Sequence, residues 1–113
     1  MSKNANYKAG YRAERKAFET LKGYGFTVFR TAGSHGLFDL IGVNEKTVIF
    51  VQVKTTPFGK IAPMERIKKE IEDFAVPEGV RKELWVMERR SGFHYFPLTS
   101  EKKRFTVKEE EGV

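Results

Sequence analysis

Three polar side chains interrupt apolar segments in the middle of the chain: Asp39, Gln52 and Lys54. Burying an acid, an amide and a lysine among valines and isoleucines costs free energy unless these groups meet partners. Carboxylate and amide oxygens are suitable ligands for a hard divalent cation such as Mg²⁺, which usually keeps several waters. A protonated lysine cannot bind such a metal, but it can orient an attacking water or stabilise charge on a phosphate. These residue types together fit metal-assisted hydrolysis of a phosphodiester.

A second carboxylate, Glu14, lies in a segment of helical periodicity that runs from about Tyr7 to Tyr24. At about 100° per residue, Glu14 falls in the middle of the apolar stripe of this helix. The residues leave two interpretations open, because Glu14 can extend to water from the first turns or point inward at a site. With Asp39 downstream we favour the site, where Glu14 could bind a cation directly, through water, or bind a second ion. The backbone carbonyl of Val53 could add a further ligand.

The elements that position these groups follow from periodicity. Apolar side chains at helical spacing predict helices over about 7–24 and 63–75, and period-two alternation predicts strands. A turn at 44–46 joins the strand of Asp39 to the strand of Gln52 and Lys54, whose side chains point to the same face. The predicted strands cover 26–31, 38–43, 47–55, 81–89 and 93–96. The order helix, three strands, helix, two strands predicts an α/β fold with a small mixed sheet flanked by helices.

Length and composition favour one domain. The chain has 113 residues, enough for a single core, and we expect residues 1–113 to form one unit with about 1–6 and 108–113 flexible. It has no cysteine, which excludes disulfides and thiolate metal sites. It contains no run of about 18 apolar residues and no apolar segment at its start, so we expect an intracellular, soluble protein without a membrane span.

The net charge of +6 favours a nucleic-acid partner. A small basic domain attracts phosphate polymers by releasing their counterions. Lys and Arg recur along the whole chain rather than in one tail, as expected for a binding surface. A basic surface that serves only solubility is the alternative interpretation.

The order of the short motifs resembles a known family. The pattern resembles that of the PD-(D/E)xK nuclease superfamily. It consists of an acid in an early helix, a loop, an Asp on one strand, and a polar residue followed two positions later by Lys on the next strand. The closer resemblance is to the archaeal-type Holliday-junction resolvases, and it covers about the first half of the chain well. The second half agrees only in the order of its elements. The motifs that carry it are Arg12-Ala13-Glu14-Arg15, Gly25-Phe26, Ala32-Gly33-Ser34, Asp39-Leu40 and Val51-Gln52-Val53-Lys54-Thr55-Thr56.

The resemblance implies a restriction-endonuclease-like core that works as a homodimer on four-way DNA junctions with Mg²⁺, for which Mn²⁺ can substitute. It implies that Glu14 and Asp39 are the metal-site acids and that Lys54 is the catalytic lysine. Ser34 matches a loop serine near the scissile phosphate, and His35 in the same loop can contact a phosphate. The arginines that correspond to DNA contacts or are suited to them are Arg12, Arg15 and Arg30.

One departure from the family pattern bears on activity. Gln52 stands where the resolvases usually carry Glu, and an amide keeps the ligand oxygen but loses the charge, so metal affinity should fall. Three alternatives therefore stay open beside a junction resolvase. They are a related nuclease with another DNA substrate, a non-catalytic DNA-binding protein whose site Gln52 has weakened, and a basic protein-interaction domain.

Overall fold

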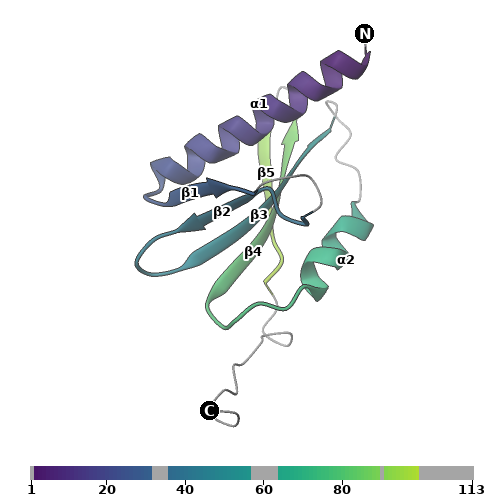
Figure 1. Ribbon diagram of the computed structural model, residues 1–113. Coiled ribbons are helices and arrows are strands. Elements are labelled where there is room, and N and C mark those ends of the chain that lie inside the picture. Colours follow the sequence, from purple (N-terminus) through teal and green to yellow (C-terminus); the bar gives the residue numbers. More distant parts are fainter. Residues whose placement is uncertain (1, 32–35, 57–63, 90, 100–113) are drawn as a thin grey trace.

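The computed structural model describes residues 2–31, 36–56, 64–89 and 91–99, with side chains from residue 10 onward. Figure 1 shows a sheet with one helix above it and a second, shorter helix beside it. The predicted order of helix, three strands, helix and two strands is confirmed. The elements are α1 (Ser2–Gly23), β1 (Thr27–Arg30), β2 (Leu40–Val43), β3 (Val48–Thr56), α2 (Glu65–Asp73), β4 (Val80–Glu88) and β5 (Gly92–Pro97).

The five strands form one mixed sheet in the order β1-β2-β3-β4-β5. Three of the four neighbouring pairs are antiparallel, and β3 and β4 are parallel, so α2 lies in the crossover between them. β2 pairs with Val48–Val51 alone, while β3 continues to Thr56. The second half of β3 therefore has β4 on one side and the end of β2 on the other.

Helix α1 covers one face of the sheet because its small and aliphatic residues recur at helical spacing. Ala17 and Leu21 are buried against Leu40, Ile49 and Val51 of the strands. The helix begins at Ser2, earlier than the predicted start near residue 7. Flexibility of residues 1–6 stays a prediction, and residues 108–113 lie outside the described part of the chain.

Helix α1 is followed by a glycine with a positive φ. Gly25 has a φ of 97°, a backbone conformation that suits glycine. The N–H groups of Gly25 and Phe26 donate to the carbonyls of Lys22 and Leu21, which closes the last turn. Phe26 and Val28 then pack on the α1 face of the sheet, as the predicted alternation requires.

Helix α2 packs on the other face and ends earlier than predicted. Ile71 is fully buried against Phe38, Leu84 and Val86. The helix stops at Asp73 rather than near residue 75, and its predicted start at Pro63 lies outside the described residues. The described helices include none that is long and apolar enough to cross a membrane.

A buried lysine explains where α2 ends. The ammonium of Lys82, on β4, donates to the carbonyls of Ile71, Glu72 and Phe74 at 2.8, 3.0 and 2.8 Å. Lys82 is only 1% exposed. Its three donors satisfy carbonyls that the last turn of a helix leaves free, and its charge complements the negative end of the helix dipole. This cap was not predicted, because in the sequence Lys82 resembles any polar residue of a strand.

Candidate active site

Asp39 directly precedes the first residue of β2 and is held in place by hydrogen bonds. Its backbone N–H donates to the Val51 carbonyl at 2.8 Å, and its carbonyl accepts the N–H of Thr31 at 3.1 Å. These bonds extend the ladders on both sides of β2 by one residue. The carboxylate oxygen Oδ2 accepts the backbone N–H of Val53 at 2.8 Å. The side chain of Asp39 thus lies beside the part of β3 that no longer pairs with β2.

Glu14 and Asp39 act on each other electrostatically, although they are far apart in the sequence. Burial raises the pKa of Glu14, the negative charge of Asp39 raises it further, and Arg30 lowers it. Burial also raises the pKa of Asp39, against the lowering effects of the Val53 N–H and of Lys54. Helix α1 therefore directs Glu14 to the same place as Asp39, which agrees with the inward orientation favoured from its position in the apolar stripe.

The segment Val51–Lys54 of β3 presents the remaining predicted groups. Val51 is buried on the α1 side of the strand, and Gln52 and Lys54 face the other side, as alternation predicted. Lys54 is exposed and close enough to Asp39 to affect its pKa. Gln52 is buried, and its amide Nε2 donates to the carbonyl of Leu37. An amide that donates through Nε2 keeps Oε1 as the atom able to bind a cation.

The carbonyl of Val53 points to the same side of β3 as Asp39. In a strand the N–H and C=O of one residue are directed to the same neighbour, and the Val53 N–H is directed to Asp39. The backbone of Val53 thus offers its oxygen beside the Asp39 carboxylate. The role of this carbonyl as a ligand stays a prediction.

These groups fit a hard divalent cation. Burial raises the pKa of both carboxyl groups, and Asp39 raises that of Glu14 further. A cation between the two groups would stabilise their charged forms. The described residues hold no cluster of three or more His, Cys, Asp or Glu side chains. A cation held by Glu14 and Asp39 could take its other ligands from neutral oxygens and water, as Mg²⁺ commonly does.

Arg30 is held beside these acids by an aromatic ring. Its guanidinium lies 4.8 Å from the ring centre of Phe18, a cation–π contact, and Lys22 lies 5.8 Å from the same ring. Phe18 follows Glu14 by one helical turn, so both are on the same face of α1. This contact was not predicted, and the sequence signal that could have indicated it is the helical spacing of four residues between Glu14 and Phe18.

Of the other predicted DNA-contacting residues, the structure describes the positions of some and not of others. Arg12 and Arg15 are exposed on α1, on either side of Glu14 in the sequence. Ser34 and His35 lie outside the described residues. The structure thus brings Glu14, Asp39 and Lys54 together with Arg30.

Comparisons with known proteins found a matching family model and a similar solved structure. A model of the family described as archaeal Holliday junction resolvase (Hjc) matches residues 5–112. Hjc of Archaeoglobus fulgidus, described as a Holliday junction resolvase from an archaeal hyperthermophile, has a similar solved structure. The TM-score is 0.56 and the sequence identity is 22%, over 80% of this chain and 73% of that chain. The predicted restriction-endonuclease-like α/β fold is confirmed.

Proposed function

Because this chain belongs to the family of archaeal Holliday junction resolvases, an endonuclease family, we propose that it cuts four-way DNA junctions with a metal-dependent site built on Glu14, Asp39 and Lys54. Family membership confirms the predicted class of enzyme and its DNA substrate. One observation supports the proposed site residues. Asp39, just before the start of β2, raises the pKa of Glu14 on α1, and Lys54 on β3 lowers the pKa of Asp39.

Each residue has a distinct role in this proposal. Glu14 and Asp39 would hold a divalent cation such as Mg²⁺ or Mn²⁺, and Gln52 and the Val53 carbonyl would add neutral oxygen ligands. Such a cation would supply Lewis-acid activation of the phosphate and of a water. Lys54 stands exposed beside Asp39, where it can orient the attacking water and stabilise negative charge on the phosphate. Arg30 supplies a fixed positive charge for the DNA backbone.

The test compares cleavage of a labelled four-way junction with cleavage of a linear duplex of the same sequence. We expect paired, symmetric cuts in the junction with Mg²⁺ or Mn²⁺ and none with chelator. Asp39→Asn and Lys54→Ala should lose cleavage and keep junction binding, whereas Lys69→Ala, a change to an exposed lysine on α2, should keep both. Equal cutting of the duplex would favour a more general nuclease. Junction binding without cutting in either metal would favour a binding protein.

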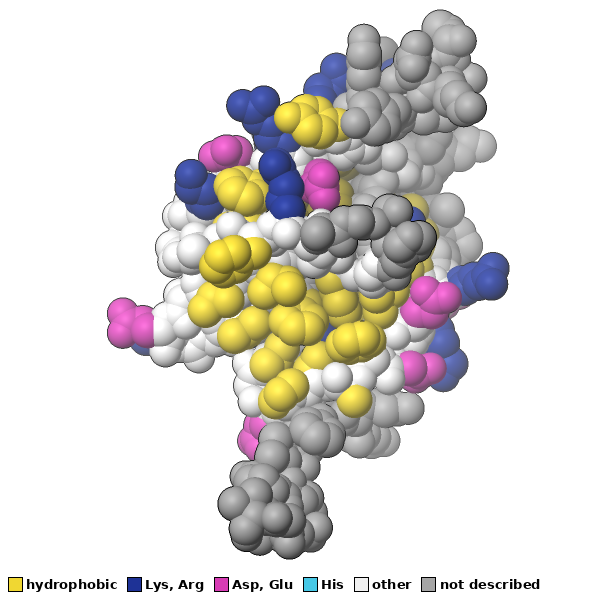
Figure 2. Space-filling model, viewed as in Figure 1, with side chains coloured by type: hydrophobic (Ala, Val, Ile, Leu, Met, Phe, Trp, Pro, Cys, Tyr) yellow, Lys and Arg dark blue, Asp and Glu magenta, His cyan; other side chains and the backbone are white. Residues whose placement is uncertain are grey.

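We also propose that the protein acts as a homodimer through the apolar face of the sheet beside α2. Alternation along β1, β2 and β3 directs Phe29, Ile41, Val43 and Phe50 to this face, opposite to Leu40 and Ile49. Antiparallel strands that face water normally present polar residues there. Phe29 is 55% exposed, and Figure 2 shows hydrophobic side chains gathered over the strands beside α2.

A dimer explains both the apolar face and the expected paired cuts, because a twofold axis presents two identical sites to two strands. Phe29→Lys should shift the protein from dimer to monomer in sedimentation velocity. Tyr11→Lys adds the same charge at another exposed aromatic residue, on α1, and should leave the dimer intact. A wild-type protein that sediments as a monomer would contradict this part of the proposal.

A further inference from the structure

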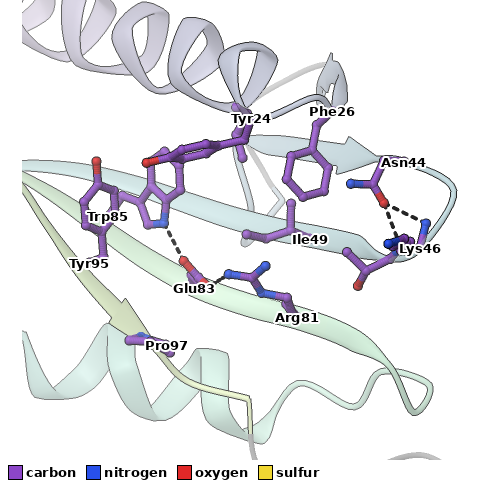
Figure 3. A pocket seen from close by; sticks show the side chains of 12 residues that line it. Tyr24, Phe26, Asn44, Lys46, Ile49, Arg81, Glu83, Trp85, Tyr95 and Pro97 are labelled. Carbon is purple, nitrogen blue, oxygen red and sulfur yellow. Dashed lines mark hydrogen bonds and ion pairs between the residues drawn. The ribbon is translucent and has the colours of Figure 1, made fainter.

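A pocket of about 600 Å³ lies between the end of α1 and strands β3, β4 and β5. This volume is in the usual range for ligand sites. The pocket contains none of the proposed catalytic residues. The last residue of α1, Gly23, follows Glu14 by nine residues, which is about 14 Å along the helix, and Tyr24 comes directly after it. Figure 3 shows the side chains that surround the pocket: Leu21, Tyr24, Phe26, Asn44, Lys46, Thr47, Ile49, Arg81, Glu83, Trp85, Tyr95 and Pro97.

One end of the pocket is aromatic, and its rings are exposed. Tyr24 is 67% exposed and Tyr95 is 46% exposed. The Tyr95 ring meets the buried ring of Trp85 edge-on, with centres 4.7 Å apart. Trp85 is itself fixed, because its Nε1–H donates to Glu83 at 2.7 Å. This end of the pocket thus has two exposed phenol rings and a fixed indole ring, and the phenol rings offer flat surfaces for stacking.

The other end of the pocket is cationic. Figure 3 shows Arg81 and Lys46 on the side away from Trp85 and Tyr95. Arg81 pairs with Glu83 at 2.6 Å, and half of its side chain is exposed. Arg81 and Glu83 balance each other's charge, so Arg81 offers a phosphate the N–H donors on the exposed half of its side chain, and Lys46 supplies the net positive charge at this end. Lys46 adds an exposed positive charge at the turn between β2 and β3.

An aromatic end and a cationic end within one pocket match the two parts of a nucleotide. We propose that this pocket binds one unpaired nucleotide of a DNA strand, with the base against Tyr24 and Tyr95 and the phosphate near Arg81 and Lys46. Stacking on aromatic side chains requires a base that has left its pair, because a paired base is already stacked inside the duplex. The pocket thus adds a contact with unpaired DNA that the metal site does not use.

Trp85 is the only tryptophan of the chain, so its fluorescence reports directly on this pocket. The experiment titrates the full-length protein, in chelator, with a short oligothymidine, an abasic strand of the same length, a blunt duplex and thymidine monophosphate. We expect saturable quenching by the oligothymidine, weaker binding of the free nucleotide, and little response to the abasic strand or the duplex. An oligonucleotide with 2-aminopurine, whose emission falls on stacking, supplies a second readout.

Two variants localise the binding. Tyr24→Ala should weaken oligothymidine binding by about fivefold or more, whereas Tyr11→Ala, at an exposed tyrosine elsewhere on α1, should stay within about twofold. Equal binding of the abasic strand would overturn the proposal, because charge alone would explain it. Equal binding of the duplex, or equal losses in both variants, would also overturn it. The assay contains no metal, so its failure leaves the proposed catalytic site untouched, and loss of cleavage leaves the pocket untouched.

Discussion

The replacement Asp39→Asn should make the metal-free protein slightly more stable while it destroys the metal site. The amide oxygen of Asn can still accept the Val53 N–H that Asp39 now accepts. The change removes a charge that burial disfavours and that raises the pKa of Glu14. It also removes an attraction to Lys54, which is exposed and so contributes about 0–1 kcal/mol. We expect a net gain of up to about 1 kcal/mol in the free energy of unfolding.

Addition of metal should reverse this order of stability. A cation at a concentration of about one hundred times its Kd stabilises the native state by about 2.7 kcal/mol. For a chain of this size that corresponds to a rise in Tm of about 10 °C. The wild type should show this rise with Mg²⁺ or Mn²⁺, and Asp39→Asn should lose most of it. The wild type is then the more stable protein in metal and the less stable one in chelator.

Thermal and urea unfolding of both proteins, with metal and with chelator, measure this reversal. Asp73→Asn is the matched control, because Asp73 forms an exposed ion pair with Lys69 on α2, far from the proposed site in the sequence. It should change the stability by no more than about 1 kcal/mol in either condition. If Asp39→Asn loses more than about 2 kcal/mol in chelator, Asp39 is a structural acid and the reasoning is wrong.

Three further predictions concern pH, Gln52 and Lys82. In the folded protein the pKa values of Glu14 and Asp39 are raised above their ordinary values of 4.5 and 3.8, so without metal the native state binds protons more tightly than the unfolded chain. Stability in chelator should therefore fall as the pH rises from the ordinary values through the raised ones. Asp39→Asn should make this fall smaller in urea titrations across pH. Gln52→Glu removes the amide that donates to the Leu37 carbonyl and should lower the free energy of unfolding in chelator by about 1–3 kcal/mol, even if the added charge strengthens metal binding. An unchanged stability in chelator would contradict this contact. Lys82→Met leaves three carbonyls without their ammonium donor and should cost about 3–5 kcal/mol in urea unfolding, whereas Lys69→Met should cost less than about 1 kcal/mol.

The sequence was most informative where the signal is local. Helical spacing in α1 and alternation in β2 and β3 are properties of neighbouring residues, and they predicted both the elements and the faces of Glu14, Gln52 and Lys54. Element ends were less predictable: α1 begins earlier, and α2 ends earlier because Lys82 from a later strand caps it. No pattern around residue 73 contains that information.

Residue type and order along the chain therefore determined the chemistry available to this protein: two acids, a lysine and a basic charge, in the order typical of one nuclease family. Only the tertiary structure decided which of these groups meet. The raised pKa of Glu14 beside Asp39, the contact of Arg30 with Phe18 and the pocket of Tyr24 and Tyr95 each join residues from different elements. Such contacts depend on strand register and on helix packing across the sheet. Those are set by the burial of the whole core, so no short segment encodes them.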